Sequence, residues 1–283
     1  MPQSASSSVQ QARQLLAERL RELVKDAGLD GKDLAALCGW HPSKVSRVST
    51  AKTQPSADDI RAWCRACGAE DQAGDLIASL RAVEGMWVSW RRIERAGLRR
   101  SQEDRLPLYE RTRRFRAYSP GLFPGLLQTF GYTEDVLRGV HRRRRVVIDD
   151  VADAVAARME RQRVLREGQR QFAFLVEESA LGNALGDAET QAEQLDHLLT
   201  VGALPNVSIG VIPVGLGRLR MPVEGFWIYD MAQVNVELVS GYLTITQPSE
   251  VTMYAETFAE LAGQAVYGAK ARALMASAMD SLG

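Results

Sequence analysis

The chain has 283 residues, of which 46% are hydrophobic and 25% are charged, and its 35 basic and 35 acidic side chains give a formal charge of zero. That composition is ordinary for a soluble globular protein. The length allows two domains, or one domain with a small appendage, and it excludes a single tiny module.

The charges are distributed unevenly along the chain. Residues 1–170 hold 31 basic and 22 acidic side chains, whereas residues 171–283 hold 4 and 13. Such asymmetry favours a basic half that faces nucleic acid, joined to a half that does not. Solvated helix faces would account for part of the same excess.

The N-terminal segment is polar, and we expect residues 1–9 to form a disordered lead. It has neither the basic nor the apolar region of a secretory signal, and no later window approaches the ~18 apolar residues of a membrane span. The three cysteines, Cys38, Cys64 and Cys67, are too few for a disulfide framework. These features predict a cytoplasmic protein with no membrane partner.

Residues 10–82 have the periodicity of short helices. Apolar residues recur at three- and four-residue steps from Ala12 to Val24, and Gly28 follows as a stop. A second helix ends at Gly39, and Pro42 suits the first position of a third. The inward side chains expected from these two helices are Leu34, Ala35, Leu37, Cys38, Val45 and Val48.

The third helix then presents a short, polar and basic outward face. Two helices joined by a glycine turn, with donors pointing away from the core, form the pattern in which the second helix enters the DNA major groove. Arginine and lysine donate to guanine, and serine reaches bases or phosphates. An ordinary helical hairpin with a solvated face is the structural alternative. The candidate DNA-binding residues are Lys32, His41, Ser43, Lys44, Ser46, Arg47 and Lys52.

The segment from Leu34 to Arg47, LAALCGWHPSKVSR, followed by Pro55 and a fourth helix, resembles the XRE-type, phage-repressor-like DNA-binding domain of five helices. The resemblance implies double-stranded DNA as a partner. Two positions depart from the family pattern. His41 stands where a serine or threonine usually caps the third helix, and Ala51 stands where the segment usually ends in glycine. We therefore expect weaker capping and fewer contacts from the far end of that helix.

Beyond this domain, the sequence predicts a connecting helical region at 83–118 and an effector or partner-binding domain at 119–283. The apolar stripe of the fifth helix continues through Trp87 and Trp90. Strands are predicted at 172–176, 207–214, 226–230, 234–239 and 242–246, the later ones close enough for an antiparallel meander, with two helices at the end of the chain. The predicted class is α+β: an all-α N-terminal domain and a C-terminal α/β domain whose small, largely antiparallel sheet is covered by helices.

Two phrases in this second part, PGLLQT at 124–129 and RMERQ at 158–162, are similar to the C-terminal domain of a large group of bacterial regulators. That group joins an XRE-type reader to an effector domain of unknown function and is sometimes described as antitoxin-like. Members are often encoded beside a very small acidic protein, so the resemblance implies a transcription factor whose second domain binds a ligand or such a partner. The candidate effector or partner residues are Trp87, Trp90, Pro124, Gln128, Arg158, Arg161, Trp227 and Tyr229.

The sequence offers no catalytic constellation. It lacks the motifs of zinc peptidases, serine hydrolases and nucleotide-binding loops, so we expect no enzyme, catalytic residue, metal or cofactor. Cys38, His41, Cys64 and Cys67 would supply four zinc ligands if their helices were adjacent, but burial as small apolar residues is favoured. The run Arg142 to Arg145 fits a solvated loop, a phosphate grip or an anchor for an acidic partner.

The leading hypothesis is a sequence-specific DNA-binding transcriptional regulator that acts as a homodimer on a palindromic operator, in the cytoplasm and at the nucleoid. Because a five-helix reader buries little DNA surface, pairing on a two-fold site strengthens binding. The alternative is an antitoxin-like interaction module that sequesters a small acidic partner and regulates its own synthesis.

Overall fold

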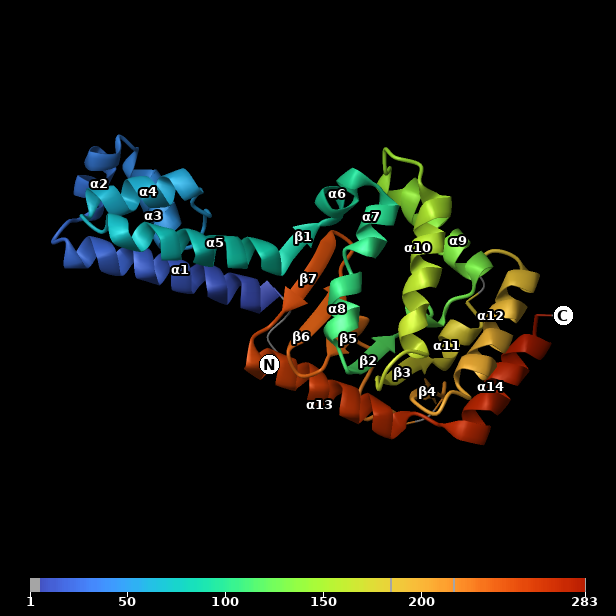
Figure 1. Cartoon of the computed structure of the whole chain (residues 1–283). Helices are drawn as coiled ribbons and strands as arrows, with labels where there is room; N and C mark the ends of the chain where they lie inside the picture. Colours follow the sequence, from blue (N-terminus) through green and yellow to red (C-terminus); the bar gives the residue numbers. More distant parts are fainter. Residues whose placement is uncertain (1–5, 184, 216, 283) are drawn as a thin grey trace. The chain divides into compact units, whose positions relative to one another are not determined.

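The computed structural model describes residues 6–183, 185–215 and 217–282, and for residues 6–9, 11, 78 and 81–87 it describes the backbone alone. The chain divides into two compact units, Met1–Val88 and Ser89–Gly283. The first is helical and the second contains the sheet (Figure 1). None of the described helices is long and apolar enough to cross a membrane.

The described part of the first unit consists of helices. They are α1 (Ser6–Asp26), α2 (Gly31–Cys38), α3 (Pro42–Ser49), α4 (Ala57–Ala66), the 3-10 turn η1 (Glu70–Gln72) and α5 (Ala73–Met86).

One apolar cluster holds these helices together. Trp63 of α4 is fully buried at its centre and donates a hydrogen bond from Nε1 to the carbonyl of Leu20, at 3.0 Å. Val45 and Val48 attach α3 to the same cluster. The predicted inward side chains are confirmed except for Leu37, which is 62% exposed because it lies on the outer face of α2.

The second unit alternates helices and strands. The chain leaves the first unit through β1 (Trp87–Ser89) and continues with α6 (Trp90–Ile93), η2 (Glu94–Ala96), α7 (Leu98–Glu103), α8 (Leu106–Arg111), β2 (Arg114–Ser119), η3 (Gly125–Leu127), α9 (Phe130–Arg144), α10 (Val151–Arg161) and η4 (Gln162–Leu165). It ends with β3 (Gln171–Glu177), α11 (Glu178–Leu181), α12 (Ala188–Val201), β4 (Val207–Ile212), β5 (Phe226–Tyr229), β6 (Gln233–Glu237), β7 (Gly241–Ile245), α13 (Pro248–Gln264) and α14 (Gly268–Asp280).

The sheet of this unit is mixed. The strands that lie wholly within this unit follow the order β7-β6-β5-β2-β3-β4. The pairs of β2 with β3 and of β3 with β4 are parallel, and β2 with β5, β5 with β6 and β6 with β7 are antiparallel. The α+β class, the helical N-terminal part and the meander of β5 to β7 are confirmed. The sheet is larger and less antiparallel than predicted, because β2 lies at its centre.

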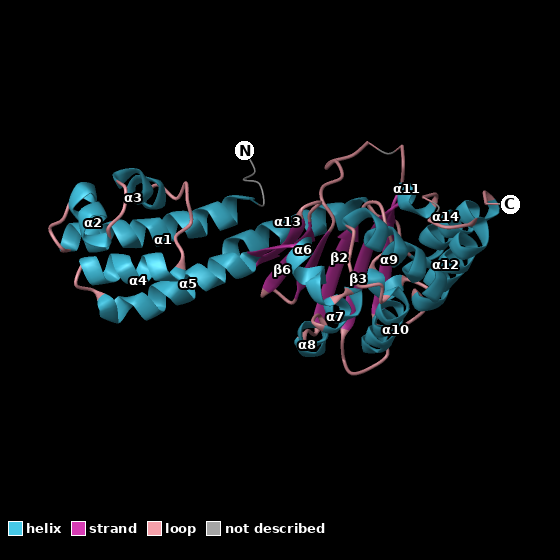
Figure 2. Ribbon diagram, turned by 90° about the horizontal axis from the view of Figure 1, so that it is seen from above, coloured by secondary structure: helices cyan, strands magenta, loops and turns pink. Residues whose placement is uncertain are grey.

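Helices cover both faces of the sheet (Figure 2). Helix α13 packs on one face, against β2, β5 and β6. The other face carries a large cluster in which Phe115, Phe172 and Phe174 meet Tyr109 of α8 and Leu195 of α12. Strands alternate their side chains between two faces. Trp227 and Tyr229 therefore share this second face with Phe115, opposite Phe226 and Ile228.

Three short segments differ from the sequence prediction. Of the expected disordered lead at 1–9, residues 1–5 lie outside the described residues, and residues 6–9 form the start of α1. Residues 83–118 were expected to be helical, but α5 ends at Met86, and the region also contains β1 and β2. In β2 the apolar Phe115 and Ala117 alternate with Arg114 and Arg116, and the buried pair packs into the central cluster. Arginines at the alternate positions obscured the period of two that marks a strand.

Candidate functional site

Helices α2 and α3 form a helix-turn-helix. Asp30 caps α2 in a reciprocal capping box with Asp33, which lowers the pKa of Asp30 because the backbone N–H groups of Asp33 and Lys32 donate to its carboxylate. Gly39 ends α2 in the left-handed conformation, with φ 66°, and turns the chain within three residues into α3.

His41 is the N-cap of α3. Its Nδ1 accepts a hydrogen bond from the backbone N–H of Ser43 at 3.2 Å and lies 2.9 Å from the Ser43 hydroxyl. An imidazole nitrogen thus takes the place of the usual serine or threonine oxygen. The start of α3 therefore has a side-chain cap in place of the usual serine or threonine.

The predicted DNA-binding residues differ in how free their side chains are. Ser46 and Arg47 are exposed on the outer face of α3, and Arg47 has no hydrogen-bond or ion-pair partner among the described side chains. Lys44 is engaged within the unit, since its Nζ lies 2.6 Å from Asp59 Oδ1 and 4.1 Å from the centre of the Trp40 ring. Arg47 is therefore the side chain best able to reach a base. The remaining exposed candidates are Lys32, His41, Ser43 and Lys52.

The three cysteines pack within the first unit. Cys64 is fully buried, and the Cys38 Sγ approaches the carbonyl of Ala62 at 3.6 Å. Burial raises the pKa of all three thiols, that of Cys67 to about 11. Thiols with such pKa values keep their protons at neutral pH. Among the described residues, no group of three or more His, Cys, Asp or Glu side chains could hold a metal.

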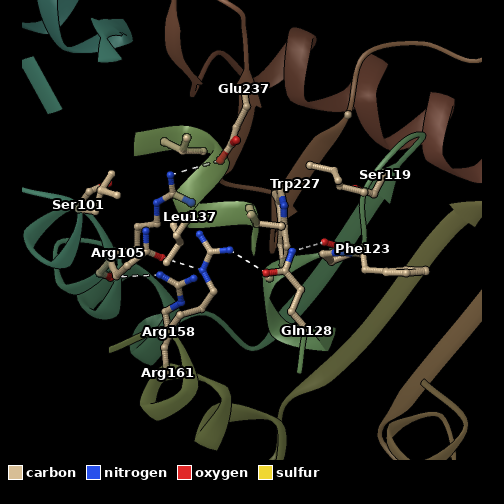
Figure 3. A pocket seen from close by; sticks show the side chains of 18 of the residues that line it. Ser101, Arg105, Ser119, Phe123, Gln128, Leu137, Arg158, Arg161, Trp227 and Glu237 are labelled. Carbon is tan, nitrogen blue, oxygen red and sulfur yellow. Dashed lines mark hydrogen bonds and ion pairs between the residues drawn. The ribbon is translucent and has the colours of Figure 1, made fainter. Parts of the chain in front are cut away.

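The second unit contains a cavity of about 250 Å³ between the sheet and the helices that precede and follow β2. Helices α7 and α10 supply its polar wall, and the segment after β2 supplies Phe123, Pro124 and Gln128. Trp227 enters from β5 (Figure 3). The cavity is therefore built by segments from across the second unit, brought together by the central position of β2.

A cluster of three arginines, Arg105, Arg158 and Arg161, lines the polar wall. Arg158 donates from Nε to Gln102 Oε1 at 3.1 Å and from Nη1 to Gln128 Oε1 at 2.7 Å (Figure 3). Arg161 donates from Nη1 to the Gln102 carbonyl at 3.1 Å. In contrast, Arg105 has a carboxylate partner, with Nη2 lying 3.3 Å from Glu237 Oε1.

Arg158 and Arg161 are deeply buried, with exposed fractions of 8% and 3%. Burial, together with the neighbouring charges of Arg161 and Arg105, lowers the pKa of Arg158 to about 9. Burial also lowers the pKa of Arg161. Both shifts record the cost of keeping a guanidinium charge away from water without an opposite charge beside it.

Six of the eight effector candidates from the sequence line this cavity: Trp90, Pro124, Gln128, Arg158, Arg161 and Trp227. Tyr229 is not among the lining residues and is buried in the core beside Tyr109 and Phe115. The side chain of Trp87 lies outside the described residues. The ring of Trp227 packs on Phe174 in the core, and the side chain also borders the cavity.

Sequence reasoning missed Gln102, Arg105, Arg144 and Glu237 as cavity residues. Arg144 belongs to the run Arg142 to Arg145, and Arg105 lies in residues 1–170 with their excess of basic side chains, but nothing in the sequence distinguishes either from arginines on solvated faces. Glu237 ends β6 on the same face as Trp227, according to the strand register. The sequence predicted that β5 and β6 are neighbours in a meander, but it did not predict which residues of the two strands pair.

The charge asymmetry belongs to the second unit. The first unit has 11 basic and 11 acidic side chains, whereas residues 89–170 have 20 and 11. The basic excess therefore does not lie on the helix-turn-helix unit. A basic half that faces nucleic acid, as the sequence favoured, would have placed the excess there. It lies in the segment that contributes the arginines of the cavity.

Comparison with known proteins identifies both parts. Residues 15–80 match the model of a helix-turn-helix domain, and residues 103–277 match a domain of unknown function, DUF5753. No curated protein matches the chain. A solved structure of the archaeal chromatin protein TrmBL2, described as showing a novel mode of DNA binding, aligns with 89% of this chain and 100% of its own at 13% identity. Its TM-score of 0.31 is too low to support an argument. Because the second match spans more than half of the chain, the protein belongs to the DUF5753 family, with a helix-turn-helix domain on its N-terminal side.

Proposed function

We propose that the protein is a sequence-specific transcriptional regulator of the XRE type that reads DNA through α3. The observation that carries this proposal is the outer face of α3, where Arg47 is exposed and unpaired while Val45 and Val48 hold the helix to the core. A guanidinium in that position suits the bidentate contact with guanine O6 and N7. The matched helix-turn-helix domain supports the same role.

The operator is a palindrome bound by two copies of the chain. One helix of this length contacts few base pairs, so a single copy discriminates weakly between sequences. A first unit with equal numbers of acidic and basic side chains also gains little from non-specific attraction to phosphates. Pairing on a two-fold site supplies the missing affinity, and the protein acts at the nucleoid in the cytoplasm.

The test is selection of bound duplexes from a random library, followed by anisotropy measurements on the selected duplex and on random DNA across a salt series. Arg47→Ala should weaken binding to the selected duplex by about 1–3 kcal/mol and relax the preference at one position. Arg65→Ala, at an exposed arginine of α4 in the same unit, is the matched control. An equal loss on every sequence would assign Arg47 to a phosphate, and absence of any selected sequence would refute the proposal.

The second unit has a binding role rather than a catalytic one. Guanidinium groups hold and orient anions but do not exchange protons at neutral pH. The buried position of Arg158 and Arg161 in the cavity wall supports recognition of a small ligand. For that reason we propose binding of a small ligand in this cavity as the main role of the second unit, in preference to binding of a partner protein.

An antitoxin-like role with a small acidic partner is the second candidate. Arg142 and Arg145 are exposed at the C-terminal end of α9, and opposite charges accelerate association with an acidic surface. The test is co-purification of the full chain with the product of a neighbouring small open reading frame. The double variant Arg142→Gln, Arg145→Gln should bind that product more slowly. Retention of an unchanged association rate would exclude this surface.

A further inference from the structure

The side chains that line the cavity carry an unbalanced charge. Five arginines and two glutamates lie in its wall. Each glutamate already has an arginine partner, with Glu94 Oε1 lying 2.5 Å from Arg144 Nη1 and Glu237 lying 3.3 Å from Arg105. Arg158 and Arg161 are left with neutral oxygen acceptors only, supplied by Gln102 and Gln128.

These two guanidiniums also keep unused donors. The Nε of Arg161 is buried and has no hydrogen-bond partner among the described residues. The hydrogen bonds of Arg158 to Gln102 and Gln128 use Nε and Nη1, which leaves its Nη2 for a ligand. A buried charge without an opposite charge and with unmet donors is unfavourable in a folded protein unless a ligand satisfies it. Burial lowers the pKa of both side chains, which agrees with this interpretation.

The opposite part of the wall is apolar. Phe123, Leu137 and Trp227 line the cavity, and Figure 3 shows Phe123 and Trp227 on the other side of the site from Arg105 and Arg161. A volume of about 250 Å³ lies just under the usual range of small-molecule sites, which begins at ~300 Å³. The cavity thus offers a charged end and an apolar end in a space suited to a small metabolite.

We propose that this cavity binds a small organic anion, with a phosphate or carboxylate group on Arg158 and Arg161 and an apolar or aromatic remainder against Trp227, Phe123 and Leu137. Planar guanidiniums match the oxygens of such groups in bidentate hydrogen bonds. The inference rests on the ligand-binding role proposed above for the second unit and names its chemical class.

The first experiment uses the full-length protein and matched probes. Phenyl phosphate and phenylacetate are titrated by calorimetry in a buffer free of phosphate and carboxylates, beside their neutral counterparts, phenol and phenylacetamide. We expect saturable binding of at least one anion and binding at least about tenfold weaker for its neutral counterpart. The two anions distinguish a phosphate from a carboxylate site. Equal binding of an anion and its neutral counterpart, or no binding of either anion, would overturn the inference.

Variants locate the site. Arg161→Gln and Arg158→Gln should each weaken binding of the preferred anion at least about tenfold. Arg161→Lys, which keeps the charge but not the fork of donors, should fall between wild type and Arg161→Gln. Arg166→Gln, at an exposed position five residues further on, is the control. Wild-type affinity in both glutamine variants would place the anion elsewhere and overturn the inference.

Operator binding measured on the same preparations separates this inference from the proposed function. Normal sequence-selective DNA binding without anion binding would refute the anion site and leave the regulator intact. Anion binding without any selected DNA sequence would refute the proposed regulator and leave the anion site intact.

Discussion

Ala51 holds a backbone conformation that favours glycine. It follows α3 with φ 54°, in the left-handed region. A side chain in this conformation destabilises the folded state by ~1–2 kcal/mol. Glycine avoids this strain but loses ~0.5–1 kcal/mol of stability, because it has more conformational freedom in the unfolded chain. We therefore expect Ala51→Gly to raise the free energy of unfolding by up to about 1 kcal/mol, measured as a higher midpoint in thermal unfolding.

Ala36→Gly provides the matched comparison for this prediction. Ala36 is exposed within α2, where glycine destabilises a helix by about 1 kcal/mol relative to alanine. The two substitutions are chemically identical and should shift the midpoint in opposite directions. A decrease in both would show that the left-handed turn at Ala51 does not carry the expected strain.

His41 and Ala51 also show what single residues reveal before a structure is known. Both were recognisable as departures from a family pattern. Only the structure shows that His41 still caps α3, because the role of its Nδ1 depends on the ring orientation and on the position of the Ser43 N–H. At Ala51 the backbone keeps the geometry that glycine would favour, so the departure there is strained.

At the scale of elements, one buried glutamine fixes the segment between β2 and α9. Gln194 of α12 is fully buried, and its Oε1 accepts a hydrogen bond from the backbone N–H of Thr129 at 2.8 Å. Its Nε2 donates to the carbonyl of Leu127 at 2.7 Å. Gln194→Leu fills the same space but leaves two buried backbone groups without a hydrogen-bond partner. Each unsatisfied group lowers the free energy of unfolding by about 1–3 kcal/mol. Urea unfolding should show a loss of about 2–6 kcal/mol in the second unit.

Thr200→Leu is the control for this change, because Thr200 is exposed on the same helix and such positions shift stability by ~0.5 kcal/mol or less. Because Gln128 of the same segment accepts from Arg158, Gln194→Leu should also weaken anion binding. A stable variant with unchanged anion affinity would mean that the segment holds its place without Gln194.

The sequence predicted elements well where local periodicity and packing agree. The helices of the first unit, β3 and the meander of β5 to β7 all have regular apolar patterns. β2 was missed because its exposed alternate positions are arginines and because its parallel partner, β3, follows only after α9 and α10. The candidate site was predicted in part for the same reason. The sequence motifs at 124–129 and 158–162 were recognised. Their contact with Gln102 and Glu237 depends on the tertiary structure, which local sequence patterns do not reveal.

At the scale of the whole molecule, the two units differ in how their charge is distributed. The first unit has equal numbers of basic and acidic side chains, so the proposed reading of DNA depends on a few exposed side chains such as Arg47. The second unit concentrates arginine in residues 89–170, partly around the cavity. A net charge of zero for the chain therefore conceals one balanced unit and one unit with a local excess of arginine.

If the cavity regulates the reader, occupancy of one must change the affinity of the other. Coupling of this kind is reciprocal and commonly amounts to a factor of about 5–150. We expect a saturating concentration of the preferred anion to change the dissociation constant of the operator by at least about fivefold. The operator should change the dissociation constant of the anion by the same factor. Anisotropy with and without the anion, and calorimetry with and without the operator, measure the two.

Arg161→Gln distinguishes coupling from a general effect of the added anion. In this variant the operator affinity without anion should equal that of wild type, since Arg161 lies in the second unit, and the response to the anion should disappear. A response that persists in Arg161→Gln would come from ionic strength, which acts on DNA binding without the cavity. Identical operator affinity with an empty and an occupied cavity would show that the ligand does not regulate DNA binding, because a ligand shifts an equilibrium only by its difference in affinity for the two states.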